Sequence, residues 1–346
     1  MFTDKTLIGL DIGNHSIKMV EIFHETENKL PVYKLHTFGQ VQHSLNLYGY
    51  WDSSILRQLS ILIESIMKQG NFSGVKTVMS VQSRDVYVTT MDFDIEWNKS
   101  QIQREIDRQA PYFLPTAPED MRLSWDIISN DPHIGAYTGK QRVIINALPD
   151  TVVDNSKNIL EHINLDGVSL ENQVLSQIRS ALRPDSGNTI LVDIGGDQTT
   201  FSIIVDTDLR ATSHIDTGAN LVTKNLAESL GVDTPIADYF KKDLSLVNLF
   251  QIPNQVSDVY KVIKSELRTF YELNRKVSQN PQKVVVTGGG VSLPGVIEYL
   301  KKDFPVPVYV ANCLRNVRVE PVVRPYILPF ANQFSTAIGL ATKDNV

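Results

Sequence analysis

A seven-residue motif that occurs twice is the feature that most constrains the fold of this chain. Residues 10–16 read Leu-Asp-Ile-Gly-Asn-His-Ser, and residues 192–198 read Val-Asp-Ile-Gly-Gly-Asp-Gln. The aspartates, Asp11 and Asp193, and the glycines two positions after them lie at one offset of 182 residues (193 − 11). Each copy follows one apolar run and precedes another, which indicates a strand, a turn and a second strand.

Such a strand-turn-strand unit is suited to binding phosphate. Backbone N–H groups of the turn can curl around an anion. The carboxylate at the end of the first strand can hold a hydrated Mg²⁺. Two copies that face each other would hold the phosphates of one nucleotide between two lobes, with Asp11 and Asp193 on the two sides of one metal ion.

The first turn carries further groups that suit a phosphate. Gly13 allows the backbone to approach an anion closely. Asn14 and Ser16 add side-chain donors, and Lys18 can place a positive charge against the β- and γ-phosphates. An ordinary hairpin turn also uses glycine and asparagine, so the first turn alone leaves both interpretations open.

The second turn makes phosphate binding the favoured interpretation. It offers backbone and hydroxyl donors on Gly195, Gly196, Thr199 and Thr200. A chance match of pattern, position and strand context is much rarer than a single glycine turn. We therefore expect the two turns to share one ligand.

A run of three glycines, Gly288, Gly289 and Gly290, follows a predicted strand at 283–286. Glycines without a Cβ would let the backbone pack flat against a purine or a ribose. A flexible tight turn is the alternative for such a run. Gly218, shortly after a predicted strand at 210–215, is a candidate for the same nucleoside pocket.

Glu171 is the third candidate catalytic residue, beside Asp11 and Asp193. We expect it to begin a helix at 171–182, just before the second turn, where its carboxylate would orient the water that attacks the γ-phosphorus. The alternative is a glutamate that the helix dipole favours at a helix N-terminus. His15 is interpreted as a solvated turn residue, since the seven histidines have no metal-ligand spacing.

Composition excludes several classes of protein. The chain has 346 residues, of which 42% are hydrophobic and 21% charged, and this suits a globular protein of about two domains. A net charge of −6 argues against a nucleic-acid partner. The single cysteine, Cys313, fits a reducing compartment. Neither a signal peptide nor a membrane-spanning run is predicted, so we expect a cytoplasmic protein that reaches a membrane only through partners.

Hydrophobic patterning predicts an α/β chain in four parts. The first lobe core spans 1–83 and is completed by 166–187 and 330–346. A strand-helix-strand-strand-helix set at 84–165, with a hairpin loop at 130–140, is predicted to be an inserted subdomain. A second lobe core covers 188–224 and 283–329, with a helical part at 225–282. The other predicted helices lie at 53–69, 100–109 (ended by Pro111), 151–163, 295–302 and 336–342.

These motifs resemble the actin-like ATPase superfamily. The resemblance rests on the two Asp-Ile-Gly turns, the triple glycine and the closing 337–341 segment, Ala-Ile-Gly-Leu-Ala. Within the superfamily the chain resembles the PilM family of type IV pilus assembly ATPases over nearly its whole length. The stretches that carry this likeness are 18–21, 101–115, 124–126, 167–175 and 285–300. The Asn14-His15 pair departs from the small hydroxyl residues that are usual there.

The resemblance implies duplicated ribonuclease H-like cores in two lobes around an ATP–Mg²⁺ cleft, with Glu171 at the family's acidic position. It also implies a groove between the first lobe and the insertion that receives the cytoplasmic N-terminal peptide of PilN. An extended peptide would dock there into pockets or pair with an edge strand. Pilus motor ATPases, the platform protein and a second copy of the chain are further candidate partners. The chain would then lie at the inner face of the cytoplasmic membrane.

Two other functions stay open at this point. One is a filament protein of cell division similar to FtsA, in which an amphipathic membrane helix follows the closing helix; here 342–346 follow it directly. The other is a small-molecule kinase of the same fold, which would need an Asp base on a substrate hydroxyl. No residue of the sequence identifies such a base.

Overall fold

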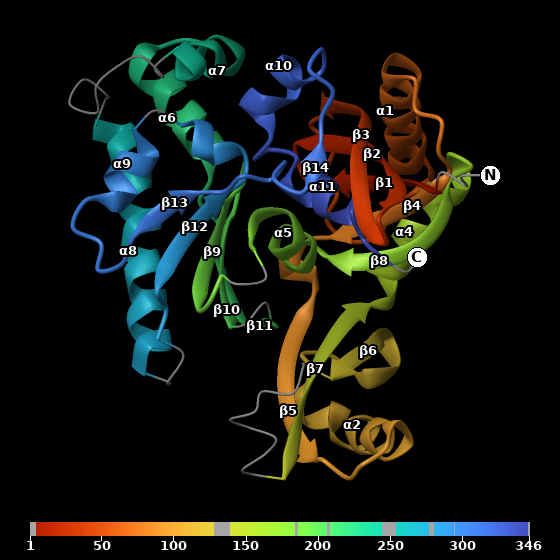
Figure 1. The fold of residues 1–346 in the computed structure, drawn as a ribbon. Coiled ribbons are helices and arrows are strands. Elements are labelled where there is room, and N and C mark those ends of the chain that lie inside the picture. The colour runs from red at the N-terminus through yellow and green to blue at the C-terminus, as the bar shows by residue number, and fades with distance from the viewer. Residues whose placement is uncertain are drawn as a thin grey trace.

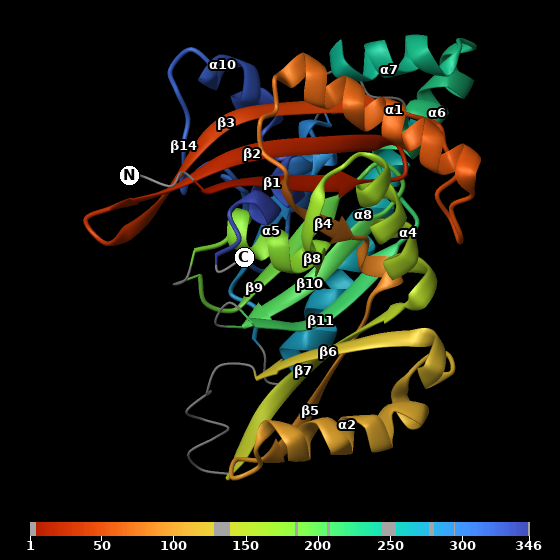
Figure 2. The ribbon, with the colours of Figure 1, turned by 90° about the vertical axis from the view of Figure 1, so that its right-hand side faces the viewer.

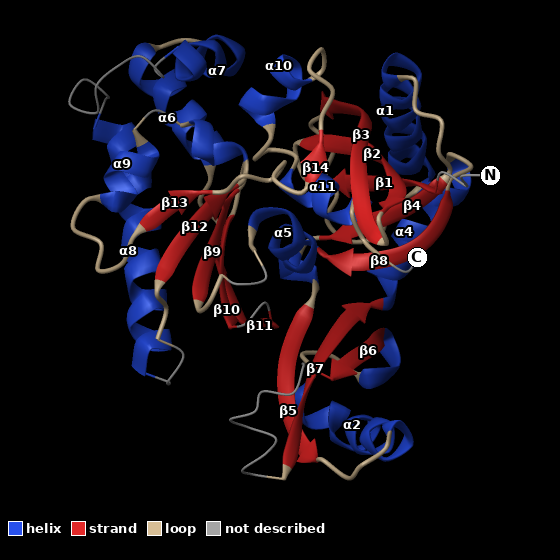
Figure 3. Cartoon of the chain, in the orientation of Figure 1, coloured by secondary structure: helices blue, strands red, loops and turns tan. Residues whose placement is uncertain are grey.

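The protein has two lobes side by side and a smaller unit that extends from the first lobe, as Figure 1 shows. The computed structural model describes residues 5–127, 139–183, 186–205, 208–243, 254–276, 280–293 and 295–344. Both lobes combine helices and strands (Figure 3). None of the helices in this described part has both the length and the apolar character that a membrane crossing requires.

The first lobe is built on a six-stranded sheet in the order β14-β3-β2-β1-β4-β8. Its strands are β1 (Lys5–Ile12), β2 (Ser16–Glu27), β3 (Leu30–Gln42), β4 (Lys76–Val81), β8 (Asp166–Asn172) and β14 (Val317–Arg318). Helix α1 (Ser53–Gly70) begins where the Asp52 side chain accepts a hydrogen bond from Ile55 N. It ends at Asn71 in the left-handed conformation, so Gly70, the predicted stop, is its last helical residue.

The second lobe repeats the arrangement of the first. Its five strands are β9 (Thr189–Ile194), β10 (Thr199–Val205), β11 (Asp208–Ile215), β12 (Lys283–Thr287) and β13 (Val308–Val310). They follow the order β11-β10-β9-β12-β13, which matches β3-β2-β1-β4-β8 strand for strand. The helices of this lobe are α6 (Ala219–Leu230), α7 (Thr234–Asp243), α8 (Asn254–Lys276) and α9 (Val296–Lys301). The predicted duplication of one α/β core is therefore confirmed.

The insertion has a separate hydrophobic core. Strands β5 (Tyr87–Asp94), β6 (Met121–Ile127) and β7 (Lys140–Pro149) form a sheet in the order β5-β7-β6, and α2 (Lys99–Phe113) covers it (Figure 2). Ile102 and Ile106 of α2 pack with Phe93, Val143 and Ile145 of the sheet. Most of the predicted hairpin loop at 130–140 lies outside the described residues.

Helix α4 (Asp150–His162) differs in packing from the rest of the predicted insertion. Its Ile159 and Leu160 join the core of the first lobe, together with Leu59 and Ile63 of α1. The domain boundaries set out from the sequence stay predictions, and α4 is the element that fits them least well.

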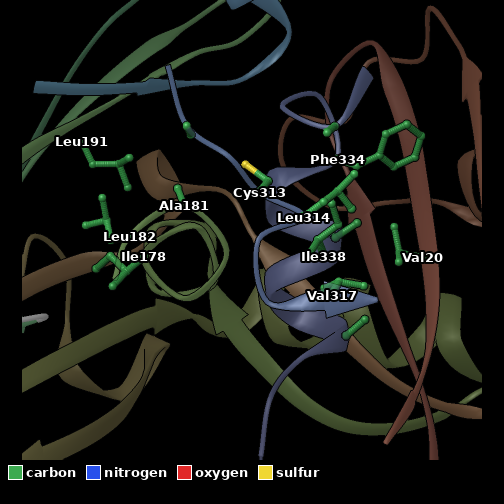
Figure 4. Packing of buried hydrophobic residues seen from close by; sticks show 14 of the residues in the cluster. Val20, Ile178, Ala181, Leu182, Leu191, Cys313, Leu314, Val317, Phe334 and Ile338 are labelled. Carbon is green, nitrogen blue, oxygen red and sulfur yellow. The ribbon is translucent and has the colours of Figure 1, made fainter. Parts of the chain in front are cut away.

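Two helices between the sheets hold the lobes together. Helix α5 (Gln173–Ala181) packs against α11 (Ser335–Ala341) so closely that a Cβ on Gly339 would lie 1.9 Å from the backbone oxygen of Ser176. The surrounding apolar cluster combines Val20 of β2, Ile178 of α5, Leu191 of β9 and Cys313 (Figure 4). One buried cluster therefore joins the two lobes.

Some local predictions were wrong. Helix α2 continues through Pro111 to Phe113, because a proline in the last turn removes only one intrahelical hydrogen bond. Strand β14 and helix α10 (Arg324–Ile327) were not predicted; both are too short for a hydrophobic period to be visible. Short 3₁₀ turns complete the description, at Ser83–Asp85, Pro118–Asp120, Gly289–Ser292 and Leu328–Phe330.

Candidate nucleotide-binding site

The two copies of the motif form hairpin turns with the same backbone geometry. In the turn between β1 and β2, Gly13 N donates to Ser16 O at 3.0 Å. In the turn between β9 and β10, Gly195 N donates to Gln198 O at 2.9 Å. A Cβ on Gly195 would lie 2.9 Å from that same Gln198 oxygen, so the tight turn requires glycine.

Asp11 lies one residue before the end of β1 and is the cross-strand partner of Lys18 in the β1–β2 hairpin. The Lys18 ammonium lies 3.6 Å from Asp11 Oδ2, and the Ser80 hydroxyl donates to Asp11 Oδ1 at 2.7 Å. Asp11 is only 8% exposed. A cation and a carboxylate therefore stand together at the base of the first turn.

Asp193 is held by two amides of α5 instead of a cation. Gln173 Nε2 and Gln177 Nε2 donate to Asp193 Oδ2 at 2.6 and 2.8 Å. Burial raises the pKa of the Asp193 carboxyl; the Gln177 hydrogen bond opposes this rise, and the negative charge of Asp11 adds to it. The two carboxylates are thus close enough to influence each other.

Both turns line one cavity of about 340 Å³ between the lobes. Helix α7 contributes Asp238 and Lys241 to its wall, and these two side chains form an ion pair of 2.7 Å. The structure brings twelve of the residues predicted from the sequence to this cavity: Asp11, Gly13, Asn14, Ser16, Lys18, Asp193, Gly195, Gly196, Thr200, Gly288, Gly289 and Gly290.

Two residues of the triple glycine also serve packing inside the protein, and the expected contact of the three with a nucleoside stays a prediction. A Cβ on Gly288, which has a φ of 88°, would lie 2.1 Å from Asp193 Oδ1, and one on Gly290 would lie 2.1 Å from Ile194 Cγ2. These two glycines therefore let the segment pack against β9. Only at Gly289 would a Cβ find ordinary space, with the nearest atom, Gln333 Cγ, at 3.6 Å.

Thr199 and Gly218 contact backbone at or near the second turn. Within the described residues, neither belongs to the lining of the cavity. The Thr199 hydroxyl donates to Thr217 O at 2.7 Å. A Cβ on Gly218 would lie 2.4 Å from Gly196 O, so the start of α6 can approach the turn only with glycine there.

Glu171 does not begin a helix, and it does not face the cavity. It lies in β8, and Asn172 caps α5 by accepting a hydrogen bond from Val174 N. The Arg179 guanidinium donates to both Glu171 oxygens at 2.7 and 2.8 Å. This carboxylate is therefore committed to an ion pair elsewhere, which argues against a role in orienting water.

Glu171 lines a second, larger cavity of about 750 Å³ between the first lobe and the insertion. Ser124 and Asp126 of β6 and Asn146 of β7 contribute from the insertion. The Asn146 Oδ1 atom is buried without a hydrogen-bond partner in the described part of the chain. An acceptor of this kind is available to a ligand.

Sequence reasoning missed several polar groups at the first cavity. The Gln198 Nε2 donor lines it and, among the described residues, is buried without a partner. Gln173 and Gln177 come from a helix that the motif does not include. The offset of 182 residues did contain one signal that was not used: it relates His15 to Asp197, and these two side chains contact each other across the cavity.

The residues at the first cavity fit a magnesium ion that is bound mainly by a nucleotide. Within the described ranges no group of three or more His, Cys, Asp or Glu side chains is gathered for a metal. Mg²⁺ usually keeps several waters and takes one or two carboxylates together with substrate phosphates. Asp11 and Asp193, buried and near each other, match that requirement.

The duplicated sheet order and the paired turns define a protein of the actin-like ATPase fold. The chain belongs to the family of the type IV pilus assembly protein PilM, whose family model matches residues 9–345. This confirms the resemblance inferred from the motifs.

Solved structures agree with this assignment of the fold. A PilM–PilN type IV pilus biogenesis complex matches with a TM-score of 0.82 at 19% identity, covering 97% of each chain. EutJ, an ethanolamine utilization protein from Carboxydothermus hydrogenoformans, has a TM-score of 0.56 at 16% identity, covering 97% of this chain and 89% of its own. MreB 5 of Spiroplasma citri bound to AMPPNP has a TM-score of 0.54 at 12% identity, covering 97% of this chain and 94% of its own.

Cell division proteins FtsA also match this chain by sequence, over part of their length. The FtsA of Neisseria meningitidis serogroup B is 27% identical over 58% of this chain and 53% of its own length. The FtsA of Pseudomonas aeruginosa is 24% identical over 71% of this chain and 66% of its own length. The chain thus spans about half to two thirds of the length of these relatives.

Proposed function

We propose that this chain is an ATP-binding scaffold and switch of the type IV pilus inner-membrane assembly complex. One observation carries the nucleotide part: two turns with equivalent backbone bonds and buried aspartates line a single cavity between the lobes. The turns would hold the phosphates by their N–H groups, and Lys18 would neutralise part of their charge. Mg²⁺, held by Asp11 and Asp193, would polarise the phosphates when bound.

Slow hydrolysis would be consistent with the groups near the turns. The amides of Gln173 and Gln177 hold the Asp193 carboxylate in place, and the free Gln198 amide can donate to a phosphate or a water. None of these groups is a strong general base at neutral pH. The chain would therefore bind and position the nucleotide more effectively than it turns it over.

Affinity for Mg-ATP tests this proposal. Calorimetric titration of Asp11→Ala and Asp193→Ala should show at least about tenfold weaker binding, because each substitution removes a buried charge beside the metal. Asp166→Ala is the matched control, since Asp166 is exposed at the start of β8 and lies outside the cavity. Unchanged Mg-ATP affinity in both cavity variants would refute the nucleotide site.

The partner part of the proposal concerns the second cavity, as the site for the N-terminal peptide of PilN. Strand β6 is one of the two outer strands of its sheet, and Ser124 and Asp126 on it line the cavity. An edge strand offers unpaired backbone groups to an extended peptide, and the free Asn146 oxygen can accept one of its N–H groups. Binding there would place the chain at the membrane through its partner.

A synthetic N-terminal peptide of the cognate PilN provides the measurement. Ser124→Tyr should weaken its binding in fluorescence anisotropy by tenfold or more, at the level of about 1.4 kcal/mol, because the ring fills exposed space beside the edge strand. Arg122→Tyr places the same ring two residues earlier on β6 and outside the cavity lining, so it should bind normally. Equal affinities for both variants would contradict this placement of the peptide.

Coupling between nucleotide and partner would pass through the two helices that the cavities share. Helix α5 donates from Gln177 to Asp193 at one cavity and presents Leu175 and Arg179 to the other. Helix α11 contributes Thr336 to the first cavity and Ile338 to the second. A ligand that shifts α5 at the first cavity would therefore move residues that line the second cavity. Peptide affinity should accordingly differ with and without Mg-nucleotide, and Gln177→Leu should reduce that difference.

A further inference from the structure

The two phosphate turns touch each other at equivalent positions. His15 occupies in the first turn the position that Asp197 occupies in the second, 182 residues later. The imidazole Nε2 of His15 contacts Asp197 Oδ2, and both side chains line the first cavity. The internal duplication therefore places one position of the motif opposite the same position of its copy, with an imidazole facing a carboxylate.

Both members of this contact are fixed by their own lobes. Asp197 Oδ1 accepts a hydrogen bond from Asn220 Nδ2 of α6 at 3.1 Å. The His15 backbone oxygen accepts from His43 N at 2.9 Å. A Cβ on Gly196 would lie 3.4 Å from the His15 ring, so the two turns are in direct contact here. The contact thus links the lobes at the point between the turns.

The charges around the cavity explain why this pair matters for a phosphate ligand. Lys18 forms an ion pair with Asp11, and Lys241 forms one with Asp238. Two side-chain amides donate hydrogen bonds to Asp193. The partner of Asp197 across the cavity is His15. Without His15, the Asp197 carboxylate would face the phosphates with less compensation, and repulsion would grow with the charge of the nearest phosphate.

Resting on the nucleotide site proposed above, we propose that His15 and Asp197 form an interlobe clasp that sets the preference of the site for a nucleoside diphosphate over a triphosphate. The clasp lies between the turns, beside the space that a third phosphate would occupy. A diphosphate would stay away from the Asp197 carboxylate, whereas the third phosphate of a triphosphate would approach it while His15 still covers part of its charge.

The clasp predicts opposite effects for its two members. Asp197→Ala removes both the clasp and the negative charge, so the affinity for triphosphate relative to diphosphate rises by about tenfold. His15→Ala removes the clasp but leaves the carboxylate uncovered, so the same ratio falls, by about threefold or more. The double variant should show the same ratio of affinities as Asp197→Ala, because His15 acts through the carboxylate that it covers. The side chains of His15 and Asp197 are 47% and 40% exposed, so their replacement should leave the packing of the core unchanged.

Fluorescent ADP and a fluorescent non-hydrolysable ATP analogue, titrated with Mg²⁺ at fixed pH and ionic strength, test the clasp. The ratio of the two dissociation constants is compared across the wild type, the three variants and two controls. His214→Ala and Asp216→Ala serve as controls, since both residues are exposed in the same lobe and lie outside the cavity lining. Thermal unfolding confirms that each variant is folded.

Opposite shifts of the ratio in His15→Ala and Asp197→Ala, with unchanged controls, support the clasp. A ratio within twofold of the wild type in both variants, while both nucleotides bind, overturns the clasp and leaves the proposed nucleotide site intact. A shift in the same direction for both single variants also overturns it. Failure of every protein to bind either nucleotide overturns the clasp together with the proposed function.

Discussion

Replacing Asp193 by asparagine is expected to stabilise the nucleotide-free protein and to weaken its binding of Mg-ATP. The Asp193 carboxylate is 7% exposed and has two amide donors, Gln173 and Gln177, but no cation among its described hydrogen-bond partners. An asparagine side chain has the same shape and keeps an oxygen to accept from those amides. It removes only the charge that is expensive to bury.

The pKa of Asp193 gives the sign of the effect. Burial raises it above the ordinary value of 3.8, so the folded state holds a proton there more tightly than the unfolded chain. The stability that this group contributes is complete below pH 3.8 and decreases as the pH rises through the raised pKa. Every tenfold decrease in the acid dissociation constant on folding costs about 1.4 kcal/mol of stability at neutral pH. Asp193→Asn removes that loss, so its free energy of unfolding should exceed the wild-type value at pH 7 and converge with it in acid.

Binding should change in the opposite direction. A carboxylate that orients the water shell of a metal contributes about 10- to 100-fold to metal affinity, and Mg-ATP binding should weaken accordingly. Urea unfolding across pH measures the first quantity and calorimetry the second, with Asp166→Asn as an exposed control that changes neither. A variant that is less stable than the wild type at pH 7, or one that binds Mg-ATP as tightly, would refute this account of the buried charge.

Three further predictions concern separate contacts. Gly289→Ala should keep its stability within about 0.5 kcal/mol and lose nucleotide affinity, whereas Gly288→Ala should lose about 3 kcal/mol or more in urea unfolding because its methyl group would meet Asp193. Glu171→Gln should destabilise the fold by about 1 to 2 kcal/mol by uncovering Arg179 and leave Mg-ATP affinity unchanged; weaker ATP binding would restore its proposed catalytic role. Burial raises the pKa of the Cys313 thiol to about 11, so it should react with a disulfide reagent about 100-fold more slowly in the folded protein than in urea, and equal rates would contradict its burial.

The phosphate turns were predictable because their physics is local. An aspartate at the end of an apolar strand, a glycine two residues later and a second strand determine the hairpin on their own, and the structure places both copies at one cavity. The shared strand order of the two sheets agrees with that duplication. Twelve predicted residues therefore meet although 182 residues separate the two motifs.

Glu171 shows where local reasoning failed. The segment at 167–172 reads equally well as the end of a strand or the start of a helix, and β8 continues to Asn172 because it pairs with β4. The capping asparagine at 172 was the available signal for the helix start. The contact of Gln177 with Asp193 has no local signal, and the contact of His15 with Asp197 has only the 182-residue offset between the two motifs.

A crystal structure with Mg²⁺ and a non-hydrolysable ATP analogue would test the proposal that both turns hold one Mg-nucleotide between them. We expect the phosphates between the backbone N–H groups of the Gly13 and Gly195 turns, with the metal facing Asp11 and Asp193. Phosphates bound to only one turn, or a nucleotide seated in the larger cavity beside Arg179, would contradict it.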